Sequence, residues 1–109
     1  MSFTIDLQAR PSRWVEYDGA QFLIAIPGAE AASVFVERNN DDLKQQAYLA
    51  AGGDRGFFAS NVLLNWKGVT DSSGEQVPYS QEAGWIALTK IDFMEFIQEE
   101  LAKLMNEAS

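Results

Sequence analysis

The first quarter of the chain is patterned as strands. At residues 3–7 every second residue is apolar, which is the period-two pattern of a strand with one buried face. Residues 13–26 place strand-forming residues on both sides of Asp18-Gly19, a pair that favours the positive φ angles of a tight two-residue turn. These patterns predict a strand followed by an antiparallel hairpin. The turn sets the facing pairs Tyr17 and Ala20, Glu16 and Gln21, Val15 and Phe22, and Trp14 and Leu23.

One face of this hairpin is apolar and must be covered. It carries Val15, Tyr17, Phe22 and Ile24. A two-stranded hairpin alone is marginally stable in water. We therefore expect it to pack on helices or to recruit residues 3–7 as a third strand, and its exposed edge could also pair with another subunit.

Two regions after the hairpin suggest short helices. Residues 30–38 fit either a helix that buries Ala31, Val34 and Phe35 or a strand through the β-branched residues, and we favour the helix. Asp41 and Asp42 occupy positions where a helix N-cap and first turn favour acidic residues. In the helix that follows, one face repeats Leu43, Ala47 and Ala50, and Gly52-Gly53 closes the C-terminus.

The middle of the chain combines an apolar run with a polar turn. Phe58, Val62 and Trp66 fall at steps of four, so residues 57–67 are predicted as a helix, with a buried strand over residues 62–66 as the competing interpretation. Residues 71–74 form a turn, and Ser80 is a good N-cap for a helix that ends near Leu88.

The last helix starts at Thr89 or Asp92 and ends near Asn106. Thr89 and Asp92 have the spacing of a capping box, although Asp92 could itself be the cap. Its apolar stripe contains Phe93, Ile97, Leu101 and Leu104, widened by Met94, Phe96 and Met105. Five acidic residues against Lys103 alone make the other face negative. Such a helix suits docking on its own core or on a basic partner.

Together these elements predict one α+β domain over residues 1–109. We expect an N-terminal antiparallel β-hairpin or three-stranded sheet packed on three to five short α-helices. Hydrophobic residues make up 47% of the 109 residues, which is enough to build a core.

Charge and composition exclude several classes of function. The net charge of −8 repels nucleic-acid phosphates and anionic lipids, so we expect neither nucleic acid nor membrane as a partner. The longest apolar runs fall far short of the ~20 residues of a membrane-spanning helix, which favours a cytoplasmic protein. Histidine and cysteine are both absent from the sequence, which removes the usual general base and the thiolate metal sites. We expect no enzyme, metal or cofactor.

Four motifs could carry chemistry, and each has a simpler explanation. Asp41-Asp42 could bind magnesium, but adjacent helical side chains diverge and capping explains both. Residues 71–75 begin like a calcium loop, but the spacing of acidic residues fails and a turn fits better. The glycine-rich residues 52–56 lack the Lys-Ser/Thr of a phosphate loop and are interpreted as an interhelix connection. Ser60 or Ser80 would need Lys67 or Lys90 as a base, and neither lies in a recognisable motif.

Two segments of the chain carry a family resemblance. Residues 66–71, 74–75 and 77–80 read WKGVTD, GE and VPYS, and residues 17–24 read YDGAQFLI. Both segments, in the order in which they occur along the chain, resemble the tail assembly chaperones of long-tailed, siphovirus-type bacteriophages and prophages. Residues 30–56 match nothing in that family.

The resemblance implies a non-enzymatic protein that binds the phage tape-measure protein, keeps it soluble and recruits tail tube protein. Such chaperones often form homo-oligomers, and many also occur in a C-terminally extended form made by a programmed frameshift. They act in the cytoplasm of the bacterial host and are absent from the mature virion. The alternatives are a structural virion component, such as a head–tail connector or tail terminator subunit, and a small carboxylate or metal enzyme. The residues that we expect at the partner surface are Trp66, Trp85, Phe93, Phe96, Ile97, Leu101 and Met105.

Overall fold

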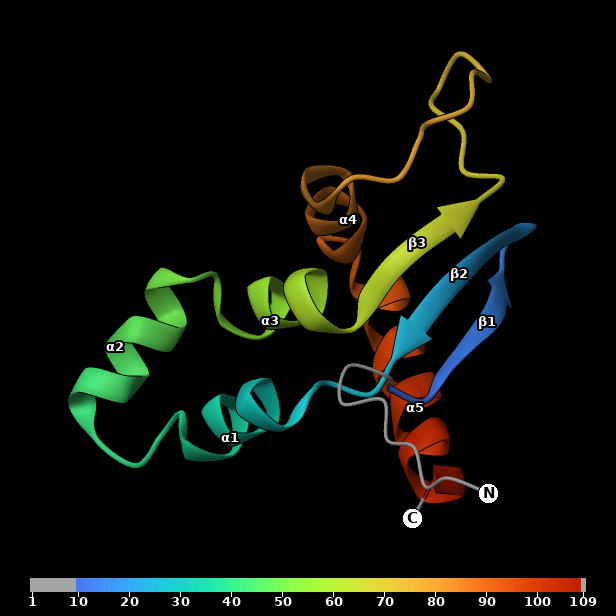
Figure 1. Ribbon diagram of the computed structural model, residues 1–109. Helices are drawn as coiled ribbons and strands as arrows, with labels where there is room; N and C mark the ends of the chain where they lie inside the picture. Colours follow the sequence, from blue (N-terminus) through green and yellow to red (C-terminus); the bar gives the residue numbers. More distant parts are fainter. Residues whose placement is uncertain (1–9, 109) are drawn as a thin grey trace, which may run out of the picture.

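A computed structural model describes residues 10–108 of the chain as a three-stranded sheet with five helices (Figure 1). This confirms the predicted α+β class. The strand predicted at residues 3–7 lies outside the described residues. The elements are β1 (Ser12–Tyr17), β2 (Ala20–Ala25), α1 (Ala29–Glu37), α2 (Asp42–Ala50), α3 (Gly53–Asn61), β3 (Leu63–Lys67), α4 (Gln81–Leu88) and α5 (Ile91–Ala108).

The hairpin of β1 and β2 forms in the predicted register. Val15 pairs with Phe22 and Tyr17 pairs with Ala20. Asp18 and Gly19 have φ angles of 51° and 82°, as a turn with two positive φ angles requires. Val15, Phe22 and Ile24 are buried, so the predicted inner face is confirmed.

The third strand is β3, which pairs antiparallel with β2. The helix predicted over residues 57–67 is therefore wrong after Asn61, and the competing strand is correct. The register shifts between Leu23 and Ile24, because β3 contains one extra residue in a bulge. Leu63 and Trp66, three residues apart, can therefore both point into the core. Spacing of three to four residues normally marks a helix, which explains the error.

Glycine and polar caps set most of the helix ends as predicted. The Asp41 side chain accepts a hydrogen bond from the Lys44 backbone amide, and Ser80 accepts one from Ala83. Gly52 has a φ of 107° and ends α2 as predicted. The interpretation of residues 52–56 as an interhelix connection is wrong after Gly52, because α3 begins at once at Gly53. The predicted Thr89 cap is wrong. Its hydroxyl donates to the Ile86 carbonyl at the end of α4.

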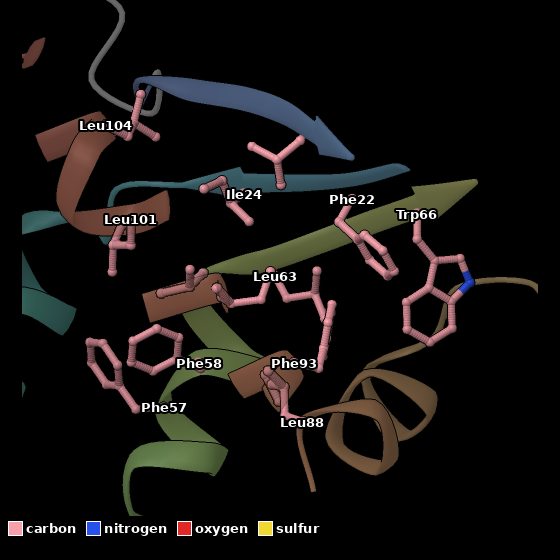
Figure 2. Packing of buried hydrophobic residues seen from close by; sticks show 14 of the residues in the cluster. Phe22, Ile24, Phe57, Phe58, Leu63, Trp66, Leu88, Phe93, Leu101 and Leu104 are labelled. Carbon is pink, nitrogen blue, oxygen red and sulfur yellow. The ribbon is translucent and has the colours of Figure 1, made fainter. Parts of the chain in front are cut away.

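The core lies between the sheet and α5 (Figure 2). The predicted stripe of α5 is confirmed, since Phe93, Ile97, Leu101 and Leu104 are all buried. The Phe93 ring lies 4.7 Å from that of Phe22 on the central strand. The apolar stripe of this helix is thus used by the chain's own core.

Helices α1 and α2 form an arm, residues 29–52, that projects away from the sheet (Figure 1). The helix favoured over residues 30–38 is confirmed, but Val34 is 55% exposed and not inward-facing. In α2 the predicted face of Leu43, Ala47 and Ala50 is exposed, and Tyr48 is the buried residue. The reason is that no core lies beneath that face, because the sheet is covered by α5.

Trp66 joins β3 to the segment that follows it. Its indole Nε1 donates a 2.7 Å hydrogen bond to the Val77 carbonyl, and its ring meets those of Phe22 and Tyr79 edge-on. The Tyr79 hydroxyl donates to the Leu63 carbonyl at 2.6 Å. These contacts hold residues 77–79 against the sheet.

We predict that Trp66→Phe lowers the free energy of unfolding by about 1–3 kcal/mol, because it removes buried volume and the hydrogen bond to Val77. Urea denaturation followed by circular dichroism measures the loss. Trp14→Phe is the control, since Trp14 is exposed and Lys67 lies over its ring. Equal losses in the two variants would contradict a structural role for the Trp66 hydrogen bond.

Gly56 is required where α3 passes the end of α2. A Cβ atom at this position would lie 2.2 Å from the Ala51 carbonyl oxygen, a backbone atom that cannot rotate away. Gly56→Ala should therefore cost about 2 kcal/mol or more of stability. Gly28→Ala is the matched control, because its Cβ would meet only the Arg10 side chain at 3.8 Å. Thermal unfolding of both variants tests the difference, and a Gly56→Ala variant as stable as the control would refute it.

Candidate partner-binding groove

A groove of about 370 Å³ opens where the turn of the β1–β2 hairpin meets α4 and the loop after β3. We call it the tip groove. Phe22 and Phe93, both buried, contribute to its lining, and Ile86 of α4 stands at its rim, 61% exposed. Its lining residues are Tyr17, Asp18, Ala20, Phe22, Gly68, Val69, Thr70, Val77, Ala83, Ile86, Ala87, Lys90 and Phe93.

The two segments that resemble tail assembly chaperones meet at this groove. Residues 17–24 supply four of its thirteen lining residues, and residues 66–80 supply another four. They are brought together because Phe22 pairs with Trp66 across β2 and β3. Gly68 then turns with a φ of 79°, and a Cβ atom added to it would lie 3.6 Å from the Ala20 backbone. Two stretches more than forty residues apart thus build one surface.

The wall of the tip groove is a small loop held by Asp71. One carboxylate oxygen accepts hydrogen bonds from the Ser73 amide at 2.9 Å, the Ser73 hydroxyl at 2.7 Å and the Glu75 amide at 3.1 Å. The Ser73 hydroxyl, followed by these backbone amides, lowers the pKa of Asp71. The Val77 amide donates to the Val69 carbonyl at 2.8 Å, which closes the loop. The turn predicted at residues 71–74 is confirmed, and it positions Val69 and Val77 in the groove.

The chemistry of the tip groove is that of an apolar binding site. Three of its polar lining residues, Asp18, Thr70 and Lys90, are exposed, and Tyr17 is partly buried. Within residues 10–108 no group of acidic side chains is arranged to hold a metal ion. Such a groove can bury a few apolar side chains of a partner and exclude water from them.

The predicted partner residues are divided between core and surface. Trp66, Phe93, Ile97 and Leu101 are buried, and of these only Phe93 lines the tip groove. Phe96 is partly buried and lies 4.8 Å from the Tyr17 ring, whereas Met105 is exposed farther along α5.

Trp85 lies apart from the tip groove, between α3 and α4. Its ring closely approaches Gly52, and Arg55 lies over it at 5.6 Å. Ile86, Val69 and Val77 were not among the predicted partner residues. The two valines lie on either side of the predicted turn, a signal that could have placed them side by side.

A second groove, of about 360 Å³, lies between α1, α2 and α3, and we call it the arm groove. Val34, Ala47, Tyr48 and Phe57 are among its lining residues. The Tyr48 hydroxyl donates to Asp54 at 2.5 Å, which ties α2 to the start of α3. Burial, followed by the Asp54 carboxylate, raises the pKa of Tyr48 well above its usual value.

We predict a loss of stability above about pH 10, the ordinary tyrosine pKa. Above this pH the unfolded chain releases the Tyr48 proton while the folded chain retains it. Raising the pH therefore lowers the free energy of unfolding. Tyr48→Phe should make the decline with pH shallower, although Tyr79, whose pKa is also raised by burial, keeps part of it. Urea unfolding between about pH 8 and pH 11 measures both slopes. If the stability of the wild type and of Tyr48→Phe declined equally with pH, the contribution of Tyr48 to the pH dependence would be contradicted.

No helix within the described residues is long and apolar enough to cross a membrane. Comparison with known proteins gives one family: the model of the YdaY prophage protein family matches residues 29–109. The matched region contains α1 to α5 and β3, and the β1–β2 hairpin precedes it. Neither the curated proteins nor the solved structures include a match to the chain.

Proposed function

This chain belongs to the YdaY prophage protein family, and from that premise we propose that it is a non-enzymatic tail assembly chaperone. In this role it binds the tape-measure protein of its phage in the host cytoplasm and promotes assembly of the tail tube. Recruitment of tail tube protein, by this chain or by an extended form of it, is part of the same proposal.

The observation that carries the proposal is the composition of the tip groove. The two segments that resemble tail assembly chaperones are separate in sequence, yet together they supply eight of the thirteen residues that line it. An apolar groove is the kind of site that receives the side chains of an amphipathic helix. A tape-measure protein is long and largely helical. Before the tail tube encloses this protein, its apolar stripes are exposed and must be shielded from water.

The acidic surface supports the same role. Asp92, Glu95 and Glu99 are exposed on α5, on the side away from the core. A net charge of −8 keeps a complex of chaperone and apolar client dispersed, because like-charged complexes repel each other. Since the apolar stripe of α5 is buried in the core, we place client binding at the tip groove instead. On α5, Phe96 and Met105 remain the accessible part of the surface that was predicted from the sequence.

The proposal predicts that the chain co-purifies with tape-measure protein when the two are expressed together, and raises its soluble fraction. Ile86→Glu should weaken this complex at least about tenfold, because it places a charge at the rim of the apolar groove. Ile91→Glu is the matched control: Ile91 is 71% exposed, but it does not line the groove. Pull-down with quantitative binding by biolayer interferometry gives the comparison.

Four outcomes would count against this function or against the tip groove as its site. Without co-purification or any change in tape-measure solubility, the chaperone role fails. Equal weakening by Ile86→Glu and Ile91→Glu would remove the tip groove as the site, and loss of binding only in Met105→Glu would move it to α5. Detection of the chain in purified virions by mass spectrometry would favour a head–tail connector or tail terminator subunit.

A further inference from the structure

Lys90 is the basic residue of the tip groove, and within residues 10–108 its ammonium group has no partner. The chain has eight basic residues, all within the described range. Of the others, four form ion pairs with carboxylates, two donate hydrogen bonds to backbone carbonyls, and one lies over the Trp14 ring. In a chain with 16 acidic residues, a lysine that pairs with none of them is an exception.

The helix ends beside Lys90 do not account for a lysine at this position. Its backbone carbonyl accepts a hydrogen bond of 2.9 Å from an amide of the first turn of α5. At this end of a helix a cation is unfavourable, and residues with side-chain acceptors are preferred. The last carbonyls of α4 already have other donors, since the Thr89 hydroxyl donates to Ile86 and the Arg55 side chain donates to Leu88. The setting that remains for the Lys90 side chain is the groove.

Within the groove, Lys90 stands between apolar residues. Ile86, four residues before it, lies exposed at the rim, and Phe93, three residues after it, is buried in the lining. A lysine in such a place lays its methylene stem along apolar surface and keeps its charge at the boundary with water. A ligand that fills the groove with an apolar side chain therefore brings its flanking residues to the ammonium group.

The other charged side chain of the tip groove is Asp18, and within residues 10–108 it forms no ion pair with Lys90 or with any other residue. The hairpin turn itself accounts for an aspartate there, because Asp18 has a φ of 51°, which aspartate adopts more readily than most residues. No such local reason applies to Lys90. Charge complementarity at the groove therefore favours a ligand that offers a carboxylate.

We propose that the tip groove recognises an amphipathic helix that carries an aspartate or glutamate beside its apolar stripe, and that Lys90 binds this carboxylate. This inference rests on the proposed function, since it specifies which segment of the client enters the groove. Apolar contacts with Ile86 and Phe93 supply affinity, and the ion pair fixes the position of the helix. A segment with a basic residue at that place is rejected, because two ammonium groups would meet at the edge of an apolar site.

Designed helical peptides test this preference on the full chain. The probes share one stripe of leucines spaced three and four residues apart and differ only in the flanking residue, which is glutamate, glutamine or lysine. The glutamate peptide should bind at least about threefold more tightly than the glutamine peptide, and the lysine peptide should bind most weakly. The net charge of −8 predicts the opposite order, because it attracts basic peptides. In fluorescence anisotropy, equal affinities, tightest binding of the lysine peptide or no binding of any peptide would overturn the proposal.

Charge reversal assigns the preference to Lys90. Lys90→Glu should bind the lysine peptide more tightly than the glutamate peptide, which is the reverse of the wild type. Lys103→Glu is the matched control: it changes the net charge by the same amount, but Lys103 is exposed on α5 and does not line the groove. An unchanged order in Lys90→Glu, or the same reversal in both variants, would overturn the role of Lys90.

Binding of tape-measure protein separates this inference from the chaperone role. If Ile86→Glu weakens that complex and Lys90→Glu does not, the chaperone role stands and the proposed carboxylate contact is wrong. If tape-measure protein does not bind and the peptides still follow the expected order, the chaperone role fails and the preference of the groove for an acidic helix is upheld.

Discussion

The bulge in β3 is the constraint on which the rest of this structure depends. One extra residue between Leu63 and Trp66 turns both side chains to the same face of the sheet. The Leu63 backbone carbonyl accepts a hydrogen bond from the Tyr79 hydroxyl, and the Trp66 indole Nε1 donates one to the Val77 carbonyl. These two hydrogen bonds bring the chain back along the sheet, so that the loop closed by Asp71 and the start of α4 stand beside the hairpin. Without the bulge, one of the two residues would face solvent and the tip groove would lose a wall.

The elements with strictly local causes were predictable from the sequence. Asp18-Gly19 is sufficient to set the hairpin register, and Ser80 and Asp41 cap helices by hydrogen bonds within three residues. The boundary between α3 and β3 was not predictable in this way. Its apolar spacing of three and four residues is shared by a helix and by a bulged strand, and only pairing with β2 decides between them.

The candidate site was predictable in part, for a related reason. The segments that form the tip groove were recognised, but their meeting depends on a strand pairing between residues far apart in sequence. The apolar stripe of α5 was correctly identified, yet a stripe carries no information on whether it covers its own sheet or a partner. In α2 the prediction failed in the opposite direction. Leu43 and Ala47 lie on an apolar face that was expected to pack on the core, but no core lies beneath it.

The central strand β2 has two neighbours that differ greatly in how they reach it. Its pairing with β1 closes a two-residue turn, an event of microseconds, whereas its pairing with β3 must close a loop that contains α1, α2 and α3. Non-local pairing of this kind is the slow part of folding. During synthesis, one edge of β2 therefore stays open until Leu63–Lys67 has left the ribosome. The order of the strands thus makes completion of the sheet, and of the groove at its tip, a late event in the folding of this chain.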